Sequence, residues 1–216
     1  REDSLEKLCQ AQRDLLYLIE RGYPMKNASV FTGNHYLLSE RQRLALVRAT
    51  SSRQAIALRR KREVIGPVPG KEAHIDGFNI IITLEIALSG STLLRCMDGT
   101  IRDLAGLRGT YRIIGKTHEA IRLLLCRLKE LEAERAVFYL DSPVSNSGRL
   151  KGLILETAQE EAMDCQVHLV PNADSVLKER EYVITSDAII LDRCKSWLNL
   201  LPGLLSSSLP GLRFVD

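Results

Sequence analysis

Apolar residues recur at helical spacing through the first part of the chain. Their period predicts an amphipathic helix over residues 4–20 and a short second element around 26–32. Ser39 opens a third helix, whose apolar positions continue through Leu58 into a run of basic residues. Residues 1–65 are therefore expected to form a small all-α domain of three helices.

A segment rich in glycine and proline interrupts this pattern at residues 66–70. Proline has no backbone N–H to donate, and glycine loses much conformational freedom in a helix, so neither residue type continues one here. Residues 66–71 are therefore expected to be a linker, and residues 72–216 a second domain.

Beyond the linker, short apolar runs alternate with stretches of helical periodicity. This alternation is typical of βα units, whose right-handed crossovers build a mainly parallel sheet covered by helices on both faces. The predicted fold class is α/β, a three-layer α/β/α arrangement, and an Asp98-Gly99 turn predicts a hairpin within residues 93–112. The strands expected are 74–76, 136–140, 165–170 and 182–184, and the helices expected are 79–88, 117–132, 147–163, 173–178 and 189–198.

An aspartate stands at or just after the end of each of these strands. These four residues, the aspartate quartet, are Asp76, Asp141, Asp174 and Asp187. Because the carboxyl ends of parallel strands share the edge at which open α/β sheets bind ligands, we expect the four side chains to converge. Carboxylates that close repel one another unless a cation is present, and oxygen ligands suit hard metals such as Mg²⁺ or Mn²⁺. Taken singly, an aspartate at a strand end is most often a helix cap or a turn residue, and Asp174 in particular could simply cap the helix that follows it.

Four short segments carry the quartet: Ile75-Asp76-Gly77-Phe78-Asn79, Tyr139-Leu140-Asp141-Ser142, Asn172-Ala173-Asp174 and Val183-Ile184-Thr185-Ser186-Asp187. In order and spacing they resemble the acidic motifs of the PIN-like nuclease superfamily, especially its NYN-type branch. The resemblance covers about residues 72–195. The whole chain also resembles an uncharacterised prokaryotic family that joins a small N-terminal helical domain to such a body.

The resemblance implies a divalent-metal-dependent ribonuclease, an endoribonuclease by analogy, that hydrolyses RNA phosphodiester bonds. It makes the aspartate quartet the catalytic carboxylates and the ligands of one or two Mg²⁺ or Mn²⁺ ions. Glu119 lies in the first turns of the predicted 117–132 helix, where many PIN-like domains carry a further acidic residue. We therefore include Glu119 among the expected metal ligands.

Polar residues near the quartet are expected to contact the substrate. Asn79 lies three residues after Asp76, Ser142 directly follows Asp141, and Ser186 directly precedes Asp187. These polar side chains could orient a phosphate or a metal-bound water. Others are basic: a Gly/Ser-rich loop that opens a helix carries two, and Arg102, Arg108 and Arg112 form a second basic loop. The substrate-binding residues expected are Asn79, Ser142, Ser186, Arg149, Lys151 and Arg112.

Charge is distributed unevenly along the chain. Residues 1–70 hold 13 Lys and Arg against 7 Asp and Glu, a balance of +6, whereas residues 71–216 hold 17 against 20, a balance of −3. Such a basic segment is ordinarily a solvated face, but beside an acidic body it favours a polyanionic partner, here RNA. The nucleic-acid-binding residues expected are Arg41, Arg43, Arg48, Arg59, Arg60, Lys61 and Arg62.

Composition excludes several classes of protein. The 216 residues are 45% hydrophobic and 26% charged, which is ordinary globular composition and not that of a disordered chain. No apolar run approaches the roughly 20 residues of a membrane span, so no membrane partner is expected. Five scattered cysteines without a CxxC pair argue against a disulfide framework or a zinc site and favour the cytoplasm. The predicted strand edges allow a homodimer without requiring one.

Other catalytic motifs are incomplete. No Walker A or GxGxxG pattern is present, so nothing supports ATP or NAD binding. Residues 98–100 read Asp-Gly-Thr, as in haloacid-dehalogenase-like phosphatases, but Cys96 stands where that chemistry needs an aspartate nucleophile. Two alternatives to the ribonuclease interpretation stay open. One is an RNA-binding module of the same fold without turnover, which is favoured if Asp174 and Glu119 are not part of the site. The other is a regulatory nuclease controlled by a partner protein.

Overall fold

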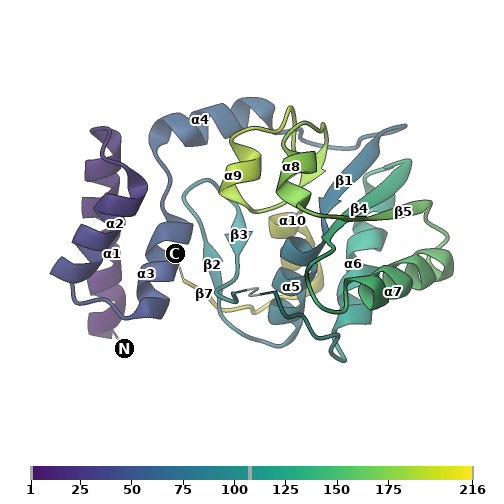
Figure 1. Ribbon diagram of the computed structural model, residues 1–216, viewed down its shortest axis with the longest axis horizontal. Helices are drawn as coiled ribbons and strands as arrows, with labels where there is room; N and C mark the ends of the chain where they lie inside the picture. Colours follow the sequence, from purple (N-terminus) through teal and green to yellow (C-terminus); the bar gives the residue numbers. More distant parts are fainter. Residues whose placement is uncertain (1, 107–108, 216) are drawn as a thin grey trace.

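The computed structural model describes residues 2–106 and 109–215 (Figure 1). The described N-terminal segment is helical and comprises α1 (Glu2–Glu20), α2 (Met25–His35), α3 (Glu40–Ala49) and α4 (Arg53–Arg62). The prediction of one long third helix is wrong, because α3 and α4 are separate helices. The backbone becomes extended at Thr50, and Ser52 caps α4 by accepting a hydrogen bond from the N–H of Ala55 at 3.2 Å. Apolar spacing continues across the break and therefore conceals it.

The first three helices pack together around a small apolar core that includes Ala11, Leu15 and Leu46. Ala45 on another side of α3 packs with Leu94 of β2 (Leu93–Arg95), so α3 also contacts the rest of the chain. In Figure 1 these helices lie at the left, and α4 crosses above the β2 and β3 region toward β1. The N-terminal helices thus meet the α/β part of the molecule through α3 and α4.

The central sheet consists of β1 (Glu72–Asp76), β4 (Arg135–Asp141), β5 (Cys165–Val170) and β6 (Val183–Ile184). Their order is β5-β4-β1-β6, and every neighbouring pair is parallel. The prediction of an α/β fold with a mainly parallel central sheet is confirmed. The register places the ends of β1 and β4 at the same edge, since Asp76 lies opposite Tyr139, two residues before Asp141.

Helices cover the central sheet on both faces. Along β4, Phe138 and Leu140 contribute to one apolar core and Val137 and Tyr139 to another, as the alternation of side chains along a strand requires. The first core lies against α5 (Gly77–Leu88), α6 (Thr117–Glu130), α7 (Ser147–Glu160) and α10 (Leu200–Ser208), and the second against α8 (Ala173–Leu177) and α9 (Ala188–Leu191).

The C-terminal part departs from the sequence prediction. The expected 189–198 helix ends at Leu191. Beyond it the backbone at Trp197 is extended and forms isolated β-bridges with Glu63 and Val183, and its indole N–H donates to the carbonyl oxygen of Arg59 at 2.8 Å. Helix α10 was not predicted. A small second sheet orders β3 (Ile101–Arg102), β2 and β7 (Phe214–Val215); its antiparallel β2–β3 pair confirms the predicted hairpin.

None of the described helices combines the length and the apolar character that crossing a membrane requires. The longest, α1, has 19 residues and carries charged side chains along its length.

Gly77, the first residue of α5, allows the helix to start directly after Asp76. A Cβ at this position would lie 2.5 Å from Cδ2 of the buried Leu140 and 3.1 Å from the carbonyl oxygen of Tyr139. We expect Gly77→Ala to lower the free energy of unfolding by about 1–3 kcal/mol, the usual cost of overpacking. Urea denaturation measures the change. Gly152→Ala in α7, where a Cβ meets nothing within 4 Å, is the control, and it should be neutral or stabilising; equal effects would contradict the argument.

Candidate active site

The carboxyl ends of β1, β4 and β6 open onto a cavity of about 480 Å³. Asp76 ends β1, Asp141 ends β4, Asp174 lies in the first turn of α8, and Asp187 precedes α9. All four line this cavity, as do Asn79 and Ser186 among the expected substrate-binding residues and Arg48 among the basic ones. The topology therefore brings the aspartate quartet to one place.

Asp76 is the most deeply placed carboxylate of the quartet. Its residue is 7% exposed, its side chain does not cap α5, and one oxygen accepts a 2.8 Å hydrogen bond from the hydroxyl of Thr185. Burial, reinforced by the charges of Asp187, Asp174 and Asp141, raises its pKa to about 7 despite the Thr185 hydrogen bond. Asp76 is thus a buried acid whose charged form the hydrogen bond from Thr185 compensates only in part.

The other three carboxylates differ in how far the protein engages them. One oxygen of Asp141 accepts from the N–H of Ala173 at 2.8 Å, and one oxygen of Asp187 accepts from the N–H of Ile189 at 2.7 Å. Asp174 does not cap α8, because Asn172 does so through the N–H of Ser175. Burial and the charges of Asp187 and Asp141 raise the pKa of Asp174.

Asn79 and Ser186 form a clamp between α5 and the loop after β6. The amide oxygen of Asn79 accepts hydrogen bonds from the N–H of Ser186 at 2.9 Å and from its hydroxyl at 3.0 Å. This clamp fixes Ser186, and so the backbone next to Asp187, relative to Asp76. Thr185 and the clamp escaped the sequence analysis as structural elements, although both lie in the acidic motifs.

The donor set suits a hard cation, but it is not arranged as a finished metal site. Among the residues that the structure describes, no group of three or more His, Cys, Asp or Glu side chains is placed to hold a metal ion. Asp141 and Asp187 each have one oxygen bonded to a backbone N–H. Even so, four carboxylates facing one cavity provide only oxygen ligands, which fits Mg²⁺ or Mn²⁺ better than a thiophilic metal.

Several expected site residues lie elsewhere. Glu119 does not line the cavity; its carboxylate pairs with Lys116 at 3.3 Å on an exposed surface of α6. Four of the six expected substrate-binding residues are also absent from the cavity wall: Ser142, Arg149, Lys151 and Arg112. Ser142, Arg149 and Arg112 are exposed, and Lys151 is half-buried. Any ligand contact that these four residues make therefore lies outside the cavity. Arg108 lies outside the described residues.

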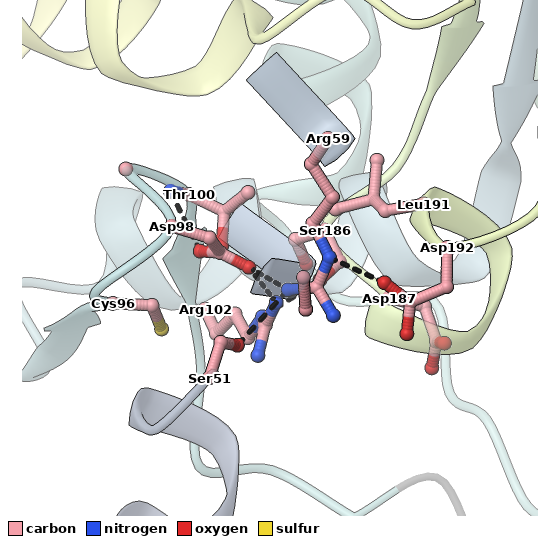
Figure 2. Close-up of polar contacts among 12 residues, drawn as sticks. Ser51, Arg59, Cys96, Asp98, Thr100, Arg102, Ser186, Asp187, Leu191 and Asp192 are labelled. Carbon is pink, nitrogen blue, oxygen red and sulfur yellow. Dashed lines mark hydrogen bonds and ion pairs between the residues drawn. The ribbon is translucent and has the colours of Figure 1, made fainter. Parts of the chain in front are cut away.

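Arg59 is not available to a nucleic acid, because it is buried in an ionic network that Figure 2 shows. Its guanidinium donates to Asp98 at 2.5 Å and to Asp192 at 2.7 Å. Arg102, expected in a basic surface loop, is buried as well and donates to Asp98 at 2.6 Å and to the carbonyl oxygen of Ser186 at 2.7 Å. Asp98 therefore joins α4 to the backbone beside Asp187.

The other expected nucleic-acid-binding residues occupy varied positions. Arg41, Arg60 and Lys61 are exposed. Arg43 packs against Gly33 and donates to the carbonyl oxygen of Leu38 at 2.9 Å, and Arg62 donates to that of Asp192 at 2.8 Å. The helical segment thus keeps exposed basic residues, while Arg59 and Arg62 attach it to Asp98 and Asp192 of the α/β body.

The pKa of Asp76 makes stability depend on pH in the metal-free protein. Between pH 3.8, its ordinary pKa, and about pH 7, the folded chain keeps a proton on Asp76 that the unfolded chain has released. The contribution of Asp76 to the free energy of unfolding is therefore fully present below about pH 4 and is lost as pH rises to 7. We expect Asp76→Asn in EDTA to unfold like the wild type near pH 4 and to be about 1–3 kcal/mol more stable at pH 8. Denaturation at both pH values tests this, and a destabilised variant at pH 8 would contradict it.

Comparison with known proteins gives the chain a family. Residues 66–202 match the family described as "Domain of unknown function (DUF5616)". The chain belongs to the DUF5616 family. Residues 7–62 match "Protein of unknown function (DUF434)". The chain is also similar to "Uncharacterized protein MJ0935" of Methanocaldococcus jannaschii, at 40% identity over 189 residues that cover 87% of this chain and 89% of that protein. No solved structure matches this DUF5616 chain.

Proposed function

We propose that this DUF5616 chain is a divalent-metal-dependent ribonuclease of the PIN-like, NYN-type kind, with the aspartate quartet at its reaction centre. One observation carries the proposal: four carboxylates from separate strand ends line one cavity, and the most buried of them, Asp76, has a pKa raised to about 7. An acidic cluster with one buried and three half-buried members is costly for a protein that only folds. Perturbed acids that share a cavity favour a catalytic centre.

Mg²⁺ or Mn²⁺ would be held by carboxylates of the quartet and, when bound, would supply an activated water and neutralise the charge that develops on the phosphate. The chain's own residues do the positioning. Thr185 orients one oxygen of Asp76, and the amides of Ala173 and Ile189 orient Asp141 and Asp187. Asn79 holds Ser186 at the cavity wall, so that polar groups fixed in advance surround the reacting phosphate.

RNA is the proposed substrate because Arg41, Arg60 and Lys61, which are exposed on the helical segment, add sequence-independent attraction for a polyanion. These three are the members of the expected nucleic-acid-binding set that the structure leaves exposed. They would hold the flanking strand, while the cavity takes the phosphate to be cleaved.

A second candidate function is an RNA-binding module of the same fold that does not turn over substrate. Two observations favour it: among the described side chains none forms a ready metal group, and Glu119 lies outside the cavity. Both functions share the basic surface and differ in the chemistry of the cavity.

Incubation with labelled RNAs and single-stranded DNA, in Mg²⁺, Mn²⁺ or EDTA, separates the two functions. The nuclease proposal predicts RNA cleavage that EDTA abolishes and that either metal restores. Binding of RNA with a steep salt dependence but without cleavage in any metal would replace the nuclease by the binding module. Equal cleavage in EDTA would rule out the metal-dependent centre.

A further inference from the structure

Arg48 brings a positive charge from the helical segment to the acidic cavity. It lies near the end of α3, its side chain is 31% exposed, and it lines the same cavity as the aspartate quartet. The other guanidinium of the cavity wall, Arg102, has all three of its nitrogens bonded: to Ser186, to the carbonyl oxygen of Arg48 and to Asp98. Arg102 is therefore committed to the structure, and Arg48 is the candidate for contact with a ligand.

The guanidinium of Arg48 is oriented from one side only. Its Nη1 donates to the carbonyl oxygen of Asp103 at 2.6 Å and to the Asp103 carboxylate at 3.3 Å. That carboxylate is itself fixed by the N–H of Ala105 at 2.7 Å and the hydroxyl of Thr83 at 2.8 Å. Within residues 2–106 and 109–215, Nε and Nη2 of Arg48 have no acceptor, so three of its five N–H groups are free to bind a ligand.

Arg48 lines the same cavity as the quartet without pairing with it. Across the described part of the chain, its one ion pair is with Asp103, although four carboxylates share its cavity. A ligand between the two must present negative charge to Arg48 and a cation to the carboxylates. A phosphodiester accompanied by a divalent metal ion has this arrangement of charge.

The backbone around Arg48 is anchored to the α/β body. The carbonyl oxygen of Arg48 accepts from Arg102, and that of Ala49 accepts from the N–H of Met97 at 3.0 Å. Arg102 in turn holds Ser186, as Figure 2 shows. Arg102 thus joins the backbone of Arg48 to the loop that carries Asp187. Together with the Asp103 contacts of the guanidinium, this link positions Arg48 before substrate arrives.

We propose that Arg48 is a catalytic residue of the ribonuclease, binding a non-bridging oxygen of the scissile phosphate in the cavity that it shares with the aspartate quartet. The inference rests on the proposed function and goes beyond it, because it makes the N-terminal helical segment a part of the active site and not only a surface that attracts RNA. The positive charge of Arg48 stabilises the phosphate most in the transition state, where the negative charge on the phosphate oxygens increases.

The test compares Arg48→Ala and Arg48→Lys with Arg53→Ala, which removes an equal charge from an exposed position at the start of α4. In Mg²⁺ or Mn²⁺ we expect Arg48→Ala to lower kcat for RNA about 10²–10³-fold with little change in KM. Arg48→Lys should keep an intermediate kcat, and Arg53→Ala should match the wild type. Added guanidinium ion should partly restore kcat to Arg48→Ala, which a merely structural defect would not allow.

Contrary results are distinguishable from failure of the nuclease proposal. If the wild type cleaves RNA and Arg48→Ala retains kcat within threefold, or raises KM alone, Arg48 is not catalytic although the nuclease stands. If the wild type cleaves nothing, binding of a ten-nucleotide RNA in Ca²⁺ and in EDTA decides: loss of the metal-dependent part of the affinity in Arg48→Ala keeps the phosphate contact and refutes only catalysis. No metal-dependent binding in the wild type overturns both.

Discussion

Asp76→Asn is expected to abolish the metal-dependent cleavage of RNA, lowering kcat at least about 10³-fold, or roughly 4 kcal/mol in activation free energy. The charges of the other three aspartates all raise the pKa of Asp76, so Asp76 lies within the electrostatic field of the whole quartet. An amide keeps the shape of the side chain and the contact with Thr185, but it supplies neither the negative charge nor the second anionic oxygen that a divalent ion needs.

Initial rates of cleavage in Mg²⁺ and in Mn²⁺ measure this effect. Asp164→Asn is the matched control, because Asp164 is an exposed carboxylate that pairs with Arg135 just before β5, at the opposite end of the strands. We expect the control to cleave like the wild type. Asp76→Asn should remain folded, and above pH 7 it should be more stable than the wild type in EDTA, so its inactivity would not reflect unfolding. A rate within tenfold of the wild type would remove Asp76 from the reaction centre.

The position of the quartet could be predicted because it depends on local pattern and on a general rule of topology. Each strand is a short apolar run, and parallel strands bring their carboxyl ends to one edge. The same rule accounts for Asn79, one turn into α5 after Asp76, and for Ser186 beside Asp187. Glu119 had no strand end to place it, and the structure puts it outside the cavity.

The roles of the arginines could not be predicted, because their partners lie far away in the sequence. The basic run around Arg59 reads as a solvated or nucleic-acid-binding surface, yet Arg59 contacts Asp98, 39 residues away, and Asp192, 133 residues away. Local periodicity carries no information on such pairs. The same limit hid Asp98, whose Asp-Gly-Thr motif forms the β2–β3 turn and presents its carboxylate to two buried cations.

Asp98→Ala is expected to lower the free energy of unfolding by about 3–5 kcal/mol, the usual cost of removing one partner from a buried ionic pair. The side chains of Asp98, Arg59 and Arg102 are 0%, 4% and 8% exposed, so water cannot replace the lost carboxylate. Burial alone would raise the pKa of Asp98, but Arg102, Thr100 and Arg59 outweigh it and hold that pKa below its ordinary value. The stabilisation is therefore present above about pH 4 and is lost as pH falls through the lowered pKa.

Urea denaturation at pH 7, followed by circular dichroism, measures the loss. Asp164→Ala removes a carboxylate from an exposed pair and should change the free energy of unfolding by less than about 1 kcal/mol. Because Asp98 joins α4 to Arg102, and Arg102 joins α3 to Ser186, its removal should also uncouple the helical segment from the cavity. A variant as stable as the control would show that this network does not hold the two parts together. The fixed position of Arg48, on which its proposed contact with the phosphate depends, would then need another cause.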